Sequence, residues 1–169
     1  MITGEAIFQK AREYVGTPYH HQARLKGKGV DCIGLLICVA KELSLPWGDV
    51  SGYGRLPDGT MEGHLIRYLE RANRTDARAG DVLTFWFSLP GVAHHVGILS
   101  DRGMIHSYAV SKKVVEHGIN DDWLSRVVSV LRFPGITPGA PVDLPVIPPP
   151  RNDFTVWTEA RRRSGGCCD

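Results

Sequence analysis

Apolar residues near the start of the chain recur with the spacing of a helix. After Thr3, a residue type that often caps helices, they fall at i, i+4, i+7 and i+8: Ile7, Ala11, Tyr14 and Val15. A glycine and then a proline follow this stripe, and both residue types end helices. The pattern therefore predicts a first helix between Thr3 and Gly16.

Two further helices are expected in the first half of the chain. Residues 16–31 are glycine-rich, basic and without a period, so they predict a loop. The second helix is expected to begin at or just after Asp31, an acceptable N-cap, and to end near Ser44; one face carries Ile33, Leu36, Ile37 and Ala40. Residues 47–59 are turn-rich. A third helix is predicted over about 60–72, with an inward face of Met61, Leu65, Tyr68, Leu69 and Ala72.

The second half of the chain changes to short strand-like runs. β-Branched and aromatic residues dominate five segments: VLTFWF (82–87), HVGILS (95–100), MIHSY (104–108), KVVEH (113–117) and VVSVLRF (127–133). Turn residues separate them, and SDRG at 100–103 is expected to connect a hairpin. Because helices come first and consecutive strands follow, the order predicts an α+β fold with N-terminal helices packed on an antiparallel sheet.

Prolines mark the predicted end of this body. Seven of the eleven prolines lie within residues 134–150, and such a segment favours an extended, polyproline-like backbone. The distribution predicts one domain over residues 1–134 and a proline-rich linker with a C-terminal tail over residues 135–169. In the tail, Phe154 and Trp157 precede three arginines. A solvated tail and a docking peptide for a partner protein both fit this composition.

Composition and charge exclude several classes of function. The 169 residues are 43% hydrophobic with a formal net charge of +2, so neither nucleic acid nor a membrane is expected as the main partner. The N-terminus lacks the basic and apolar runs of a secretory signal, and no segment approaches the roughly 18 apolar residues of a membrane span. We therefore expect synthesis in the cytoplasm. Four cysteines in such a chain predict no disulfide framework, and the sequence assigns no role to the adjacent Cys167 and Cys168.

One cysteine has the setting of a nucleophile. Cys32 follows the predicted N-cap Asp31, where backbone N–H groups and the helix dipole favour a thiolate. Gly34 leaves space beside it for a substrate or a facing strand. A buried structural cysteine is the alternative, and it suits Cys38, which lies in the middle of the same helix, better than Cys32.

Two histidines could complete such a site. His95 and His106 fall on strands that the predicted hairpin makes neighbours, so one imidazole could act on Cys32 and the other could orient it. Two polar residues on a solvated sheet face are the alternative reading. A zinc site built from these three residues is a second alternative, although no fourth ligand suggests itself.

These residues carry a resemblance to a known family. The strings DCIGLL (31–36), HVGIL (95–99) and MIHS (104–107) resemble the three motifs of the NlpC-type cell-wall peptidases, a family of papain-like cysteine hydrolases. GTPY (16–19) and AGDVLTFW (79–86) match the usual flanks, so the resemblance covers residues 4–134. It implies a papain-like NlpC-type fold, with Cys32 as the nucleophile, His95 as the general base, His106 as the orienting residue, and no metal or other cofactor.

The chain also departs from the family pattern. Ile33 stands where the family usually has serine, and His20, His21, Gln22 and Ala23 stand where an aromatic residue and two glycines are common. The His-Gln form is similar to the phage-tail and gene-transfer-agent branch of the family. By this resemblance His21 replaces a tyrosine hydroxyl near the oxyanion, and we expect His21, Gln22 and Tyr19 to contact substrate.

The resemblance implies a function as well as a fold. It predicts hydrolysis of an amide in a peptidoglycan stem peptide, usually the γ-D-glutamyl–diaminopimelate bond, by an enzyme mounted on a tail or baseplate during DNA delivery. The protein would be made in the cytoplasm, reach the wall in a virion or tail-like particle, and bind a tail hub protein through its C-terminal tail. A structural tail component without catalysis and a cytoplasmic recycling peptidase are the alternatives.

Overall fold

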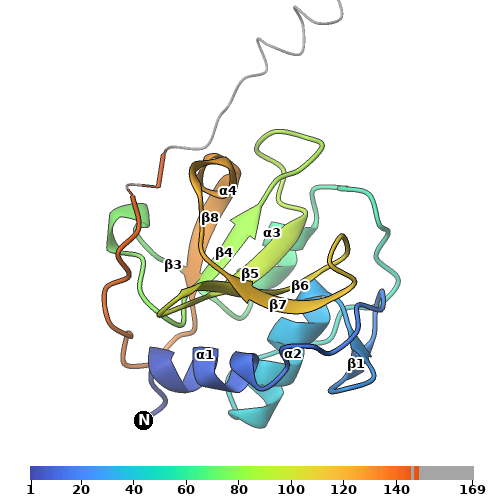
Figure 1. Cartoon of the computed structure of the whole chain (residues 1–169), viewed down its shortest axis with the longest axis horizontal. Helices are drawn as coiled ribbons and strands as arrows, with labels where there is room; N and C mark the ends of the chain where they lie inside the picture. The colour runs from blue at the N-terminus through green and yellow to red at the C-terminus, as the bar shows by residue number, and fades with distance from the viewer. Residues whose placement is uncertain (146, 149–169) are drawn as a thin grey trace, which may run out of the picture.

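A six-stranded antiparallel sheet forms the centre of the molecule. The computed structural model describes residues 1–145, 147 and 148 (Figure 1). The strands are β3 (Glu70–Arg71), β4 (Val82–Phe85), β5 (His95–Ser100), β6 (Gly103–Tyr108), β7 (Lys113–His117) and β8 (Val127–Arg132). Their order is β3-β8-β4-β5-β6-β7, and every neighbouring pair is antiparallel. The predicted α+β class and the five predicted strands are therefore confirmed, whereas β3 was not predicted.

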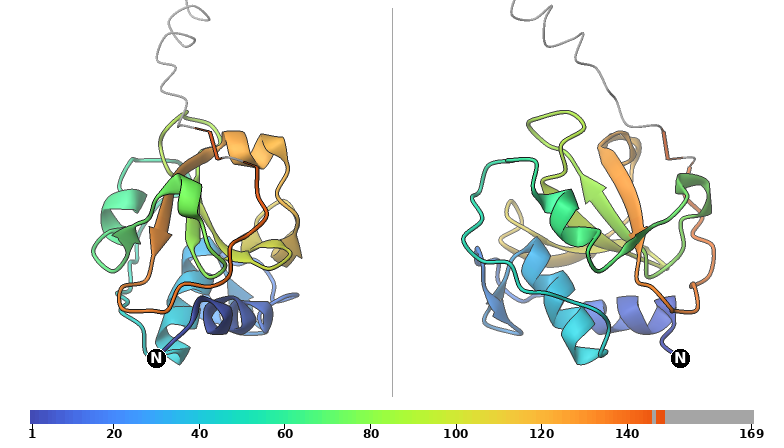
Figure 2. Two further views of the ribbon diagram at one scale, coloured as in Figure 1. Left: turned by 90° about the vertical axis from the view of Figure 1, so that its left-hand side faces the viewer. Right: turned by 180° about the vertical axis from the view of Figure 1, so that it is seen from behind.

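Two helices cover one side of this sheet. Helix α1 (Gly4–Arg12) and helix α2 (Cys32–Glu42) contact each other and β5 and β6. Both predicted caps are present, because the Thr3 side chain accepts from the Ala6 N–H and the Asp31 side chain accepts from the Gly34 N–H. Figures 1 and 2 show α1 and α2 together at one end of the molecule and α4 (Asp121–Ser125) at the opposite end. Among the described residues, no helix is long and apolar enough to cross a membrane.

The core lies on both faces of the sheet, as strand alternation requires. One cluster joins the helices to the sheet and includes Ile7, Leu35, Val82, Ile98, Ile105 and Leu131. The second lies on the other face, against α4, and includes Leu83, Phe85, Leu99, Met104, Leu124 and Val130. Successive residues of β4 and β5 thus enter different clusters, so a register slip in either strand would exchange their packing partners.

Three predictions about local structure were wrong. The predicted helix over 60–72 is the short α3 (Met61–Leu65), because residues 70 and 71 pair with β8 as β3 instead of continuing a helix. The predicted loop over 16–31 contains a two-stranded hairpin, β1 (Arg24–Leu25) and β2 (Gly29–Val30). Val15, expected on the buried face of the first helix, is 48% exposed because α1 ends at Arg12.

The turn between β5 and β6 requires a glycine. Ser100 pairs with Gly103 across the turn, and Gly103 has a φ of +132°. A Cβ atom at Gly103 would lie 2.1 Å from the carbonyl oxygen of His117 on β7. This close approach brings the ends of β6 and β7 together where their histidines lie.

Residues 135–145, 147 and 148 run along the body outside the helices and the six-stranded sheet (Figure 1), and we call these residues the strap. Near its start the Gly4 N–H donates to the Thr137 carbonyl at 2.9 Å and the Thr137 N–H donates to the Ile2 carbonyl at 3.0 Å. Near its end Ile147 is 4% exposed and the Pro148 carbonyl accepts from Arg74 at 2.7 Å. The domain boundary at residue 134 stays a prediction, but the chain does not leave the body there. The tail residues Phe154, Trp157, Cys167 and Cys168 lie outside the described residues.

Candidate functional site

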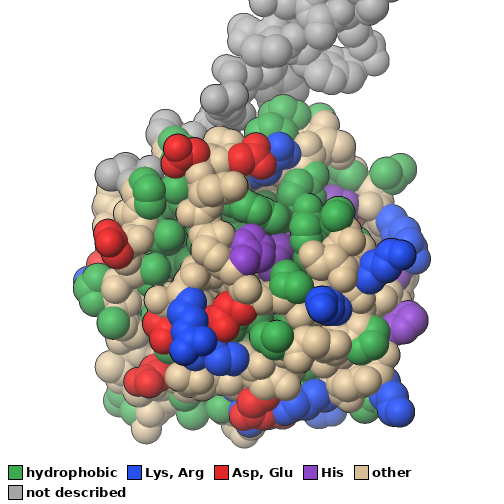
Figure 3. Space-filling model, in the orientation of Figure 1, with side chains coloured by type: hydrophobic (Ala, Val, Ile, Leu, Met, Phe, Trp, Pro, Cys, Tyr) green, Lys and Arg blue, Asp and Glu red, His purple; other side chains and the backbone are tan. Residues whose placement is uncertain are grey.

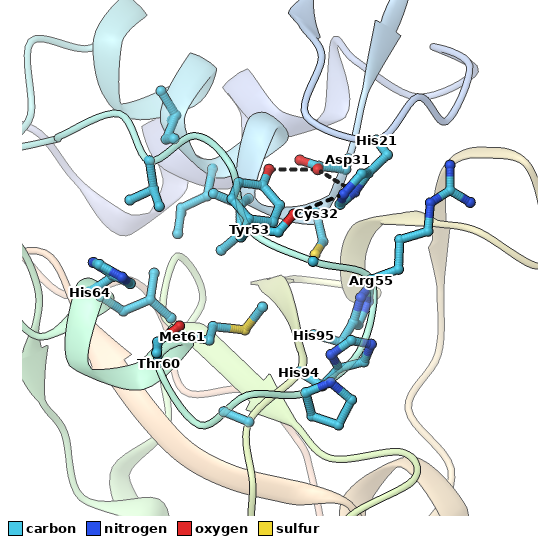
Figure 4. A pocket seen from close by; sticks show the side chains of 18 of the residues that line it. His21, Asp31, Cys32, Tyr53, Arg55, Thr60, Met61, His64, His94 and His95 are labelled. Atoms are coloured by element: carbon cyan, nitrogen blue, oxygen red, sulfur yellow. Dashed lines mark hydrogen bonds and ion pairs between the residues drawn. The ribbon is translucent and has the colours of Figure 1, made fainter.

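A cavity of about 480 Å³ brings the predicted nucleophile and base together. Cys32 lines it from the start of α2 and His95 lines it from the start of β5 (Figure 4). The cavity extends away from them over apolar residues of α2, α3 and the 46–57 loop: Leu36, Ile37, Ala40, Pro46, Trp47, Met61 and Leu65. The reactive groups therefore occupy one end of a largely apolar chamber.

Burial and a neighbouring carboxylate both act on the ionisation of Cys32. Burial raises the pKa of the Cys32 thiol from 9.0 to about 12, and the adjacent Asp31 carboxylate acts in the same direction. Backbone N–H groups of Val96, Ile33 and Cys32 oppose this shift in the Cys32 pKa. The backbone N–H groups at the helix start therefore favour the thiolate as expected, but burial has the larger effect on the Cys32 pKa.

His95, His106 and His117 form a continuous chain of hydrogen-bonded imidazoles, which we call the relay. His95 Nε2 lies 2.7 Å from His106 Nδ1, and His106 Nε2 lies 2.8 Å from His117 Nε2. His117 Nδ1 lies 2.7 Å from the carbonyl oxygen of Gly118. His95 is 6% exposed and His106 is fully buried, so only His117 reaches the surface. On the face of the molecule that Figure 3 draws, histidine side chains lie among apolar side chains.

Burial disfavours the charged form of both inner imidazoles. Burial lowers the pKa of His95 from 6.5 to about 3, with His94 and His117 contributing in the same direction. Burial likewise lowers the pKa of His106 to about 2, and the neighbouring His95 and His117 add to the effect. Burial thus opposes charge on both the Cys32 thiol and the His95 imidazole in the free protein.

Aromatic rings enclose the relay. The Tyr108 ring stacks on His106 with centroids 5.0 Å apart, and the Phe87 ring lies 5.4 Å from His95. Trp123 lies edge-on to His106 at 5.2 Å. These contacts shield the bond between the buried His95 and His106 from water, which strengthens that bond.

The three predicted substrate contacts lie in different surroundings. Tyr19 and His21 line the cavity, and the sequence expectation for them stays a prediction. His21 Nδ1 lies 3.5 Å from Asp31, and His21 Nε2 lies 3.1 Å from the carbonyl of Tyr53. Gln22 is not among the residues that line the cavity. Its side chain donates to the Tyr53 carbonyl at 2.9 Å and accepts from the Gly52 N–H at 3.0 Å, so Gln22 holds the neighbouring loop.

Tyr53 and Arg24 are two site residues that sequence reasoning missed. The Tyr53 hydroxyl donates to Asp31 Oδ2 at 2.6 Å and accepts from Arg24 Nη2 at 3.0 Å. Arg24 also donates to Asp31 Oδ1 at 3.3 Å. Figure 4 shows Tyr53, Asp31 and His21 facing one another beside Cys32. No local signal marked Tyr53, because it lies in a turn-rich segment whose position depends on these distant partners.

Hydrogen bonds between rings occupy ring nitrogens of the histidines at the site. In the part of the chain that the structure describes, no group of three or more His, Cys, Asp or Glu side chains is placed to hold a metal ion. His95 and His106 instead use facing ring nitrogens to bond each other. Both ring nitrogens of His106 are thus engaged in the relay.

The sequence matches no family model and no curated protein. Solved structures are similar in fold. The NlpC/p60 domain of the peptidoglycan hydrolase SagA is 27% identical, with a TM-score of 0.52, and the match covers 76% of this chain and 97% of that domain. An NlpC/P60 family protein from Bacillus cereus is 20% identical, with a TM-score of 0.62, and the match covers 77% of this chain and 40% of that protein.

A third similar structure is that of an amidase. An N-acetylmuramoyl-L-alanine amidase from Bacteroides uniformis is 16% identical, with a TM-score of 0.53, over 77% of this chain and 98% of that one. A lipoprotein-like NLP/P60 protein from Staphylococcus aureus has a TM-score of 0.57, and the chain spans 41% of its length. The chain therefore has the fold of the NlpC/P60 peptidoglycan hydrolases, which are cysteine peptidases.

Proposed function

We propose that this protein hydrolyses an amide bond in a peptidoglycan stem peptide by cysteine–histidine catalysis. The observation that carries the proposal is the meeting of Cys32 and His95 in one cavity of an NlpC/P60 fold. His106 bonds the buried side of His95, as an orienting residue must. The proposed roles are nucleophile for Cys32, general base and acid for His95, and orientation for His106.

The proposed reaction is acyl transfer in two stages. His95 accepts the Cys32 proton as the sulfur attacks the amide carbonyl carbon, which gives a tetrahedral intermediate. The C–N bond then breaks, His95 returns the proton to the leaving amine, and a thioester on Cys32 remains. His95 next takes a proton from water, the hydroxide attacks the thioester, and the Cys32 sulfur leaves with the proton to restore the thiol.

The oxyanion of each tetrahedral intermediate needs donors near the sulfur. The start of α2 supplies backbone N–H groups there, and the Cys32 N–H is the donor that we assign to the oxyanion. His21 lines the same end of the cavity and is bonded to both Asp31 and the Tyr53 carbonyl. Both ring nitrogens of His21 are used in these contacts, so this support would hold the ring in position as a substrate contact.

For the bond and the biological setting we carry forward the more specific sequence expectations. Arg55, His64 and His94 line the cavity, and such groups suit the carboxylates of a stem peptide with a γ-D-glutamyl–diaminopimelate bond. The His21–Gln22 form of the loop favours the tail-associated branch, with release in a virion or tail-like particle and a tail hub protein as partner. Residues 149–169 are the proposed attachment to that partner.

The catalytic proposal is tested with defined peptidoglycan fragments and mass spectrometry. Wild type should cleave one amide bond, and Cys32→Ala should abolish cleavage while the protein stays folded. Cys38→Ala is the matched control, because Cys38 lies on the same helix but does not line the cavity. Cleavage by Cys32→Ala would contradict the proposal. An inactive wild type whose Cys32→Ala particles still deliver DNA would favour a structural tail component.

The attachment proposal has a separate test. Deletion of residues 149–169 keeps the whole strap, whose contacts with the body are described above. We expect the shortened protein to cleave fragments at the wild-type rate but to be lost from purified particles. Normal incorporation into particles would contradict the proposed role of these residues.

A further inference from the structure

We propose that His117 is a positioning residue that fixes the tautomers of the relay, so that His95 presents an unprotonated Nδ1 to Cys32. This inference rests on the proposed function, because it assigns a role in the same cysteine–histidine chemistry. His117 does not line the cavity, so it would act through His106 and His95 and not by contact with substrate.

Strand register places the three imidazoles in a diagonal row. His106 pairs with Val115 on β7, two residues before His117, so His106 and His117 are diagonal neighbours on one face. On the other side of β6, Ile98 pairs with Ile105, which sets His95 diagonal to His106 in the same way. A Cβ atom on Gly97 would lie 3.4 Å from the His106 Cβ, so the glycine leaves this side of β6 open to the ring.

The Gly118 carbonyl at the outer end of the relay sets which atom donates and which accepts in each of its hydrogen bonds. The Gly118 carbonyl can only accept, so His117 Nδ1 must carry a proton to bond it at 2.7 Å. A neutral His117 then has an unprotonated Nε2, which accepts from His106 Nε2–H. His106 Nδ1 is consequently the acceptor for His95 Nε2–H. His95 Nδ1 is left without a proton.

This direction is the one that catalysis needs. A general base must offer a lone pair, and with Nε2 protonated the only lone pair of His95 is on Nδ1. If His106 instead donated to His95 Nε2, His95 Nδ1 would carry the proton and could not accept one from Cys32. The inner rings are buried and enclosed by aromatic side chains, so bulk water cannot reset the tautomers, and the carbonyl beyond His117 decides between the two arrangements.

Two substitutions of His117 test separately the role of its ring and the role of its acceptor nitrogen. His117→Phe keeps a planar ring against Trp123, which lies 5.6 Å away, but removes the acceptor for His106. His117→Gln removes the ring but offers an amide oxygen at a similar distance along the side chain. His20→Phe is the matched control, because His20 is an exposed histidine outside the relay. His117→Leu supplies the acceptor-free variant if the phenylalanine variant does not fold.

The first readout is the tautomer of each histidine, measured by nitrogen-15 NMR on the full chain. In wild type we expect unprotonated Nδ1 on His95 and His106 and protonated Nδ1 on His117. His117→Phe should give mixed tautomers at His106 and His95, whereas His117→Gln and His20→Phe should keep the wild-type pattern. A different wild-type pattern, or an unchanged pattern at His95 and His106 in His117→Phe, would overturn the proposal.

The second readout is steady-state cleavage of a stem-peptide fragment. We expect kcat to fall about tenfold in His117→Phe, equivalent to the loss of one buried hydrogen bond, with KM unchanged. The glutamine variant should recover most of this kcat. A loss that glutamine does not restore would assign His117 a structural role only and overturn the proposal. The NMR result needs no substrate, so failure of the peptidase function and failure of the relay assignment are distinguishable.

Discussion

At the scale of single residues, the Asp31 carboxylate serves two functions with opposing effects. It accepts from the Gly34 N–H at 2.7 Å to cap α2, and it accepts from the Gln22 N–H at 2.7 Å and the Tyr53 hydroxyl at 2.6 Å to hold two loops. The same negative charge raises the pKa of the adjacent Cys32 thiol. Asp31 therefore holds the segment that carries Cys32 and also disfavours the thiolate form of Cys32. Because the thiol form is favoured, a base must remove its proton, and we assign that role to His95.

The neutral thiol predicts how alkylation of Cys32 depends on pH. The pKa of Cys32 is raised to about 12 and that of His95 is lowered to about 3, so both groups stay neutral between these values. We expect the rate of iodoacetamide alkylation at Cys32, followed by peptide mass spectrometry, to rise about tenfold per pH unit from pH 6 to 9. Half-buried Cys38 provides an internal comparison. A plateau in this range would indicate a thiolate–imidazolium pair and contradict the prediction.

At the scale of elements, one arginine fastens α1 to the edge of the sheet. Arg12 Nε donates to Glu116 on β7 at 2.9 Å, and Arg12 also bonds Asp101 in the turn between β5 and β6. The Arg12 guanidinium lowers the pKa of Glu116 below its ordinary value of 4.5. Both side chains are mostly buried, at 21% and 13% exposure, so this ion pair is screened less than a surface pair.

Removing this charge should make the stability less dependent on pH. A carboxylate whose pKa is lowered by folding contributes stability above its unfolded pKa and loses it as the pH falls through the folded value. We expect Glu116→Gln to lower the free energy of unfolding by about 1–2 kcal/mol at pH 7, with the difference from wild type shrinking below pH 4.5. Urea unfolding at several pH values measures this. A pH-independent difference would contradict the prediction, and exposed Glu70→Gln is the control.

The sequence predicted those elements and site residues whose position depends on residues nearby in the chain. The start of α2 followed from Asp31, because a cap bonds its own first turn. The strands followed from their β-branched runs. The length of the third helix was wrong because pairing of β3 with β8 depends on a segment far away in the chain. Tyr53 and His117 were missed for the same reason, since each is defined by partners that only the tertiary fold brings near.

At the scale of the whole molecule, three glycines allow the start of α1, the entry to β4 and the strap to meet. A Cβ atom on Gly4 would lie 2.1 Å from the Ala79 carbonyl oxygen, and one on Gly139 would lie 2.2 Å from the same atom. Gly80 also lies close to Gly4, because a Cβ atom on Gly80 would lie 2.4 Å from the Gly4 Cα. This contact joins backbone segments that are far apart in sequence, and no larger residue fits there.

Substitution at this contact should destabilise the whole domain. Gly139→Ala places a methyl group against a backbone carbonyl, so we expect the free energy of unfolding to fall by about 1–3 kcal/mol. Gly63→Ala is the matched control, because a Cβ atom at Gly63 has nothing within 4 Å and alanine suits its helix. Chemical denaturation measures both. Equal stability of the two variants would show that the strap can move away without cost.

The strap also determines how the domain would bear a mechanical load. Its outer end is held by Arg74, which donates to the carbonyls of Val127, Val128 and Pro148, each at 2.7 Å. Its inner end is bonded to the residues that precede and begin α1. Force applied to the chain beyond residue 148 would therefore be shared first by Arg74, which passes it to the start of β8, and by the bonds of the strap to the start of α1. The strap would be stretched first, and β5, β6 and β7, which carry the relay, would keep their register during that stretching.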